Sequence, residues 1–572
     1  MKLKNIIISA LAVATLASCV DLDYSEVTTN DEQWVYQSPN YGIQRLVTSL
    51  YARIPNGIDK NFEGGSGATF AAACDEADCA LSNSNVRKFY NGGWSPINPF
   101  AYTWENSYKA IAEANNYLEK QYKIDLSAYE NNNDYQAMKS KFEMFEYEAR
   151  FLRAWFYFEL VRTYGDVPFT LKSLTNDQAN SLSRTPAVEV MDWIVAEMDR
   201  IAEYLPVTYT TELNTDIGRA TKPMCLALKA RTLLYKASPL FNTAGRKDWW
   251  LDAARATHDL LVRADGWGIK LGKYASIWGP DNGDGTEVIF AEKQGALSSW
   301  EKYNYPVGVE NGQSGMCPTQ TLVDAYEYQD SRETFGSRHA AQTINLSTSN
   351  PYEGLDPRFA MTVVKNGDLW PKYNTNPIEV FEGGLNASPL TNATQTGYYL
   401  KKYCDPNVNI STNNATETQH VWVLMRLGEF YLNYAEAMFN YYGDANAKGE
   451  FTMSANDAVN KILDREDVQM PHWTDNSDWK ARYERERMVE LAFEDHRFWD
   501  IRRWKQGDSQ KQVKVVRLSK NQNGDVLMTG GGALNIGLRK AFEDELMRDV
   551  FVANHPQFNG AIGAALLASE RG

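Results

Sequence analysis

The sequence is poor in metal-binding residues, and those it has are scattered. Among 572 residues there are six cysteines and six histidines, and no Cys-x-x-Cys motif occurs. No two histidines are four residues apart, and none belongs to a His-Glu-x-x-His motif. Protein zinc sites depend on such spacings. The sequence therefore predicts no metal site, and we expect no cofactor.

The cysteines also provide little material for disulfides. Cys74 and Cys79 form the one close pair, and the others beyond the N-terminal segment are Cys225, Cys317 and Cys404. A chain of this size does not need disulfides to stabilise its core, so we expect mostly buried thiols. A single bridge between Cys74 and Cys79 remains open.

Signatures of common enzyme sites are missing as well. No Gly-x-Ser-x-Gly motif, Walker loop or dinucleotide fingerprint occurs. The segment 281–287 resembles a calcium loop, but glycines occupy positions that need oxygen ligands, which favours a turn. A pair of carboxylates for glycosidic cleavage remains open, because such a pair is defined by its distance in the folded protein rather than by its spacing in the sequence. We expect a protein that is not an enzyme, with a secreted glycoside hydrolase as the alternative.

The charge and the aromatic content indicate the kind of partner. The chain has 58 Lys and Arg against 73 Asp and Glu, a net charge of −15, and no basic stripe, so we expect no nucleic acid partner. It has 16 Trp and 32 Tyr against 23 Phe. Because Trp and Tyr carry a polar tip, this excess favours binding surfaces as well as core.

The N-terminal segment has the pattern of an export signal. Lys2 and Lys4 precede the apolar run 6–16, which is too short to span a bilayer. The sequence Leu-Ala-Ser-Cys that ends at Cys19 resembles the lipobox of bacterial lipoproteins. We therefore predict a signal peptide at residues 1–18 and lipidation of Cys19, with several acyl chains giving stable anchoring.

Apolar periodicity predicts a mostly helical chain whose helices come in adjacent pairs, loosely similar to tetratricopeptide hairpins. The predicted helices cover about 41–53, 102–121, 142–164, 185–205, 222–238, 249–263, 424–442, 455–466 and 479–494. Between about 264 and 421 the chain is rich in Gly, Asn, Pro and Thr, with short strand-like runs at 287–290 and 361–364. We interpret residues 19–572 as a single domain with this loop-rich excursion.

One charged segment predicts a salt-bridged helix face. In Glu484-Arg-Glu-Arg487, acidic and basic side chains alternate, and helical spacing would pair Arg482 with Glu486 and Arg487 with Glu490. Such spacing is typical of a salt-bridged surface rather than of an active site.

Four blocks, in order, resemble the SusD/RagB family of Bacteroidetes outer-membrane lipoproteins. They are EARFLRAWFYFELVRTYGDVP at 148–168, DPRF at 356–359, LMRLGEFYLNYAEA at 424–437 and ERERMVELAFEDHRFWDIRRW at 484–504. Asp75-Glu76 and 104–116 resemble weaker early blocks. The C-terminal segment 550–558 departs from the family's usual Pro-rich ending, which puts the packing of the C-terminus in doubt.

The resemblance implies a mostly α fold, with four tetratricopeptide-like helix pairs packed against an irregular, loop-rich half with short strands. It implies a cell-surface lipoprotein that binds oligosaccharides and delivers them to a SusC-like TonB-dependent outer-membrane barrel. Some members bind peptides instead, which remains an alternative. The long blocks are expected to hold the two halves together rather than to bind ligand.

No motif marks the ligand site, so its candidates come from local composition. The segment 90–98 is rich in turn-forming residues and holds Tyr90, Trp94 and Asn98, with Asp75 upstream as a partner for hydroxyl groups. A family loop at about this place often carries binding aromatics. From the excursion we add Trp278, Trp300 and Tyr303, which lie in polar, glycine-bearing surroundings.

Overall fold

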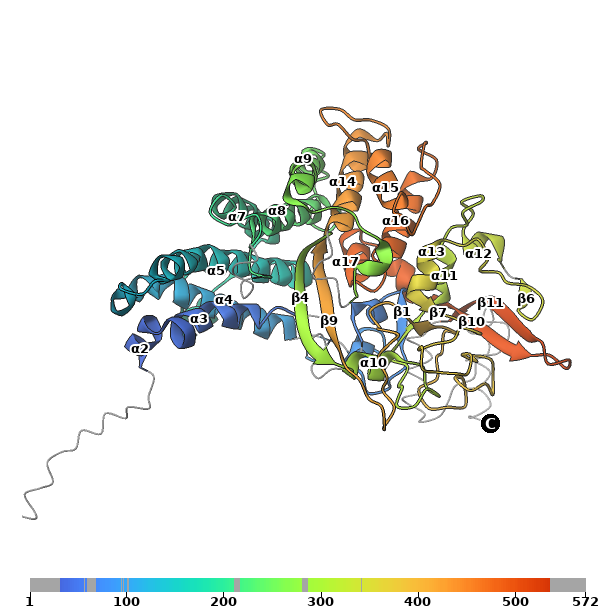
Figure 1. The fold of residues 1–572 in the computed structure, drawn as a ribbon. Helices are drawn as coiled ribbons and strands as arrows, with labels where there is room; N and C mark the ends of the chain where they lie inside the picture. The colour runs from blue at the N-terminus through green and yellow to red at the C-terminus, as the bar shows by residue number, and fades with distance from the viewer. Residues whose placement is uncertain are drawn as a thin grey trace, which may run out of the picture.

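The computed structural model describes residues 31–55, 57–58, 68–93, 95, 97–99, 102–209, 217–279, 287–340 and 342–534 (Figure 1). Four features predicted above lie outside these residues or largely so: the lipidation site Cys19, the aromatic Trp94, the turn at 281–287 and the C-terminal segment 550–558. No helix among the described residues is both long and apolar enough to cross a bilayer.

A row of helices forms one half of the molecule, and each helix packs on the next (Figure 1). After the short α2 (Glu32–Gln37), the row contains α3 (Gln44–Tyr51), α4 (Tyr102–Lys120), α5 (Tyr135–Tyr164), α7 (Ala187–Ile201), α8 (Lys222–Ala237), α9 (Asp248–Ala264), α14 (Leu427–Tyr442) and α15 (Ala455–Leu463). Consecutive helices contact one another along the described part of this row, and taken two at a time they form four pairs: α3–α4, α5–α7, α8–α9 and α14–α15. The mostly α fold is thereby confirmed.

Local signals explain where these helices start and stop. The Thr221 side chain accepts a hydrogen bond from Met224 N and Pro223 lies in the first turn of α8. Gly165 and Gly443 end α5 and α14 with φ angles of 76° and 72°, a conformation that favours glycine. Predicted boundaries differ most at α5, which begins at Tyr135, and at residues 424–426, which belong to a strand rather than to α14. The predicted helices 185–205, 455–466 and 479–494 also extend three to four residues beyond the ends of α7, α15 and α16.

The loop-rich half is built from short strands and short helices. The long pair β4 (Val288–Leu297) and β9 (Thr418–Arg426) runs antiparallel beside the helical row (Figure 1). The other pairs of this half are β1 (Ala77–Cys79) with β5 (Met316–Pro318), β7 (Val363–Val364) with β8 (Tyr399–Leu400), and β11 (Val526–Leu534) between β10 (Val513–Lys520) and β6 (Thr343–Asn345). Its helices are α10 (Ser299–Asn304), α11 (Gln320–Ala325), α12 (Phe335–Arg338), α13 (Pro357–Thr362), α16 (Trp479–Glu490) and α17 (His496–Arg503). The pair β2 (Val167–Pro168) with β3 (Arg184–Thr185) and the short α6 (Asn176–Ser181) instead connect α5 to α7 in the helical row.

The two halves share one hydrophobic core, and no disulfide joins the described cysteines. Buried side chains from α3 through β11 form a continuous cluster. None of the five described cysteines forms a disulfide, and all but Cys74 are buried, namely Cys79, Cys225, Cys317 and Cys404. The expectation of mostly buried thiols is confirmed.

The two ion pairs predicted within α16 are wrong, because Glu486, Arg487 and Glu490 are buried and pair with residues of other elements. The Glu490 carboxylate lies between Arg426 Nη1 at 2.8 Å, Arg358 Nη1 at 2.9 Å and Arg465 Nη2 at 3.0 Å. Burial opposes the charge of Glu490, but the three arginines outweigh it and lower its pKa to about 2.

This buried ionic network extends along the same junction between helical row and loop-rich half. Arg426 also contacts Glu494 and Glu287, and Arg487 contacts Asp500 at 2.6 Å instead of Glu490. Most of these residues belong to the three later sequence blocks that resemble the SusD/RagB family. The structure confirms the expectation that these blocks hold the two halves together.

Candidate functional site

A cavity lies where the helical row, the β4–β9 pair and α17 meet. It has a volume of about 60 Å³, and its lining includes Phe70 and the three tryptophans Trp155, Trp422 and Trp499. At about 15 Å³ per water, the cavity holds ~4 water molecules. Pockets that enclose small organic ligands have volumes of roughly 300 Å³ or more, so this cavity is too small to enclose a sugar ring.

The polar groups around the cavity are of both kinds, since it is lined by the carboxylates of Glu159, Glu494 and Asp495 and by the guanidinium groups of Arg162 and Arg231. The indole Nε1 atoms of Trp155 and Trp499 are buried without a hydrogen-bond partner, although both residues line the cavity. Burial lowers the pKa of His496 well below 6.5, and Arg231 and other nearby arginines add to the effect. His496 therefore stays neutral at pH 7, and charges of both signs line the cavity beside it, so its small volume suits water molecules.

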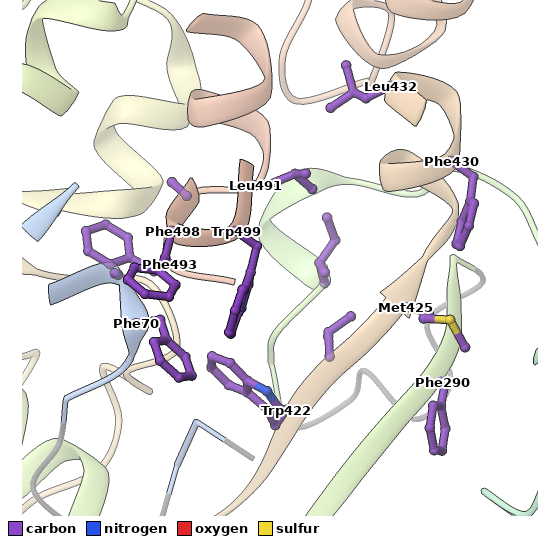
Figure 2. Close-up of a cluster of buried hydrophobic side chains, with 14 of the residues drawn as sticks. Phe70, Phe290, Trp422, Met425, Phe430, Leu432, Leu491, Phe493, Phe498 and Trp499 are labelled. Atoms are coloured by element: carbon purple, nitrogen blue, oxygen red, sulfur yellow. The ribbon is translucent and has the colours of Figure 1, made fainter. Parts of the chain in front are cut away.

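An aromatic cluster connects this cavity to the predicted ligand loop. The Phe70 ring lies 5.0 Å from the Phe498 ring and 5.1 Å from the Trp499 ring, measured between centroids (Figure 2). Phe89, at the end of η3 (Asn85–Phe89), packs edge-on against Phe70 and Phe498 at 5.9 and 5.4 Å. The segment 90–98 thus starts from a rigid, buried base.

The described part of segment 90–98 is a compact turn held by its own hydrogen bonds. Ser95 and Asn98 exchange backbone hydrogen bonds, and Asn98 Nδ2 donates to Gly93 O at 2.7 Å. Ile97, at the tip, is 95% exposed, and Asn98 is exposed as well, whereas Tyr90 is half-buried. Burial raises the pKa of Tyr90, so its hydroxyl remains protonated. The described residues of the turn therefore present an apolar side chain, Ile97, to solvent.

Asp75 lies close to this base but is already engaged. It is 5% exposed, and its two carboxylate oxygens accept from Arg497 Nε at 2.9 Å and Arg497 Nη2 at 2.8 Å. Gln510 Nε2 adds a contact at 3.3 Å. This bidentate pair joins the residues after η2 (Phe70–Ala73) to α17. The sequence could not predict the pair, because Asp75 and Arg497 are 422 residues apart.

The candidates from the excursion lie deeper than expected. Trp300, on α10, has an exposed fraction of 0%, so its assignment as a ligand contact is corrected: it is a core residue. The burial of Trp300 could not be predicted from its polar sequence neighbours, because α10 has only six residues and shows no apolar periodicity. Trp278 and Tyr303 are half-buried and pack against the core. The Lys402 ammonium lies 4.8 Å from the Trp278 ring centroid, which fixes that ring in place.

Sequence reasoning missed the cavity and the exposed Ile97. The three cavity tryptophans come from α5, β9 and α17, and no local pattern connects such distant segments. Ile97 did have a signal, since an isoleucine between proline and asparagine in a turn has no strand or helix to bury it.

The arrangement defines a helix-pair scaffold that displays a turn near a small cavity lined by tryptophans. Proteins of known structure share this fold over most of the length of the chain. A SusD-like protein from Bacteroides fragilis is 25% identical, covers 91% of this chain and 97% of its own, and superposes with a TM-score of 0.71. A second structure from that organism, described as a SusD-like carbohydrate binding protein, is 24% identical with a TM-score of 0.66, over 84% of this chain and 89% of its own.

Sequence comparisons agree with the structural ones. The model of the SusD family matches residues 286–529, and a second SusD-like model, described as starch-binding associating with outer membrane, matches residues 26–234. SusD-like protein P25 of Formosa agariphila is 22% identical over 529 residues, 88% of this chain and 90% of its own. The chain belongs to the SusD family.

Proposed function

We propose that this protein is a cell-surface lipoprotein that captures oligosaccharides and delivers them, uncleaved, to a SusC-like TonB-dependent barrel in the outer membrane. The observation that carries the proposal is the SusD family membership across both halves of the chain, together with relatives described as starch-binding and carbohydrate-binding. Outer-membrane association is part of the description of one matching family model.

The surface chemistry supports a glycan ligand. Sugar rings present apolar C–H faces that stack on aromatic side chains, while their hydroxyls need amide or carboxylate partners. The turn 90–98 offers Trp94 and Ile97 beside the amide of Asn98. Because the adjoining cavity is too small to enclose a sugar ring, the oligosaccharide lies across the outer surface of this turn, with Tyr90 at its base. Trp278 and Tyr303 stay secondary candidates at the edge of the excursion.

A binding panel with product analysis tests this proposal. The full chain is titrated with soluble oligosaccharides of several linkages and with peptides, and each mixture is then chromatographed after long incubation. We expect binding to at least one glycan with no change in its chain length. Sustained release of shorter products would instead establish a glycoside hydrolase, and binding of peptides alone would establish a peptide-binding member.

The membrane anchor has its own test. Cells that express the wild type or Cys19→Ala are labelled with a radioactive or clickable fatty acid, and the protein is immunoprecipitated. Label on the wild type alone is expected, and label retained on Cys19→Ala would refute the proposed lipidation. Detergent extraction of native membranes should also recover a TonB-dependent barrel with the wild type, whereas recovery of the lipoprotein alone would count against that partner.

A further inference from the structure

Exposed aromatic side chains are concentrated at one end of the helical row. Among the described residues, four Trp, Tyr or Phe side chains belong to the exposed large apolar group, and three of them are Trp34 (37% exposed), Tyr41 (64%) and Tyr122 (79%). They lie on α2, on η1 (Pro39–Ile43) and on η4 (Gln121–Lys123). We call these three elements the N-terminal tip.

The N-terminal tip is a built surface rather than a frayed end. Glu32 on α2 pairs with Lys120 at 2.8 Å and with Lys123 at 2.7 Å, which flank Tyr122. The Asp31 side chain caps α2 by accepting from Trp34 N at 2.7 Å. The contacts of α2 with η1 and η4 keep the three aromatics on neighbouring elements.

Cations are interleaved with these aromatics. Lys120 and Lys123 border Tyr122, and the Arg45 guanidinium lies 5.7 Å from the Tyr41 ring centroid. Trp and Tyr together with Lys and Arg are the residues that favour the interface between water and a bilayer, where aromatic rings lie among headgroups and cations contact phosphates.

We propose that the N-terminal tip rests in the headgroup region of the bilayer that carries the lipid anchor, and so orients the helical row on the membrane. This inference rests on the proposed lipidation of Cys19. From Cys19 to Asp31 there are twelve residues in the sequence, which span at most about 40 Å when fully extended. Because the anchor cannot hold α2 farther away than this, the aromatic surface nearest to it is the one that meets lipid. In Figure 1 the loop-rich elements β7 and α12 lie at the opposite end from α2.

A spin-label depth measurement tests the inference. The lipidated full chain carrying Tyr122→Cys is labelled with a nitroxide and reconstituted into phosphatidylcholine and phosphatidylglycerol vesicles. Leu369→Cys is the matched control, since Leu369 is 67% exposed but follows β7 in the loop-rich half. Unsubstituted protein gives the background from the five described cysteines. Vesicle flotation reports the anchor, and collision rates with oxygen and with a water-soluble nickel complex report the depth of the label.

We expect both proteins to float, with the Tyr122→Cys label more accessible to oxygen than to nickel and the Leu369→Cys label the reverse. Adding Trp34→Ser and Tyr41→Ser to the Tyr122→Cys protein should move its label toward water without changing flotation. Flotation with a water-exposed Tyr122→Cys label overturns the inference but leaves the anchor intact. If the label is shielded from water only after a TonB-dependent barrel is added, the N-terminal tip contacts protein rather than lipid, and the inference is overturned. If the protein does not float with the vesicles, the lipid anchor itself is refuted.

Discussion

Glu490 shows how much the junction between the two halves depends on single buried charges. Its carboxylate satisfies three arginines that come from α13, β9 and the residues after α15. Removing one member of such a network leaves the others charged, buried and unpaired, which costs more than the pair contributes.

Glu490→Gln should therefore lower the free energy of unfolding by about 3–5 kcal/mol. The matched control is Glu466→Gln, because Glu466 also pairs with a cation, Lys273 at 2.8 Å, but its side chain is 76% exposed. The control should lose about 0–1 kcal/mol. Denaturant midpoints of the two variants decide the point, and equal shifts would contradict the buried network.

Glu76 is a buried carboxyl whose pKa is raised, unlike that of Glu490, and it predicts a stability that falls as the pH rises. Burial raises its pKa from 4.5 to about 8, and its Oε2 atom has no hydrogen-bond partner while Oε1 accepts from Phe493 N at 2.5 Å. A carboxyl whose folded-state pKa is raised contributes its full stability below pH 4.5. This contribution is lost at up to about 1.4 kcal/mol per pH unit as the pH rises toward 8.

Glu76→Gln removes this ionisation, so the variant should gain stability relative to the wild type between pH 5 and pH 8. Thermal unfolding at several pH values measures the difference, and Glu466→Gln should show no comparable trend. A constant difference between Glu76→Gln and the wild type across this range would show that Glu76 is not held neutral by burial.

At this scale the sequence predicted residue types better than residue partners. Mostly buried thiols could be predicted from the number and spacing of the cysteines, whereas the structural role of the long blocks followed from their resemblance to the SusD/RagB family. The partners of Asp75 and Glu490 could not, because Arg497 is 422 residues from Asp75 and Arg358 is 132 residues from Glu490. Trp300 was misplaced for the same reason: its local polarity says nothing of the core that folds over it.

Helix ends are the most local features of the fold, and Gly165 gives the clearest test among them. It ends α5 with φ 76° and ψ −121°, a region almost restricted to glycine, and a Cβ there would meet no atom within 4 Å. Any cost of a substitution is therefore conformational rather than steric.

Gly165→Ala should lower the free energy of unfolding by about 1–3 kcal/mol. Gly266→Ala is the matched control, since its Cβ also meets no atom within 4 Å and its backbone needs no positive φ. It should be neutral or stabilising by up to about 1 kcal/mol. If calorimetric unfolding shows the same shift for both variants, backbone conformation is not what ends α5.

Helix positions followed the sequence closely where apolar periodicity was strong, as in α4, α8 and α9. The start of α5 was missed because residues 135–141 are mostly polar and exposed, so they carry no apolar stripe. The β4–β9 pair was seen only as a short run at 287–290, since pairing with a strand 130 residues away has no local signature.

On the scale of the whole molecule, the helical row and the loop-rich half are joined by a shared core and a buried ionic network. This rigidity suits a protein that holds a ligand on its surface and passes it on. The turn 90–98 rests on the aromatic cluster of Phe70, Phe89 and Phe498, so a ligand bound there meets a preformed surface.

Calorimetry of a glycan identified in the binding panel, with the wild type and Trp94→Ala side by side, tests the central claim most directly. The account predicts that Trp94→Ala weakens binding by about 1–3 kcal/mol, the scale of a lost aromatic contact, while the melting temperature stays nearly unchanged. Leu369→Ala, which removes an exposed apolar side chain elsewhere, should leave the affinity intact. Unchanged affinity in Trp94→Ala would contradict a glycan site at this turn, and lost affinity together with a lost fold would place Trp94 in the core instead.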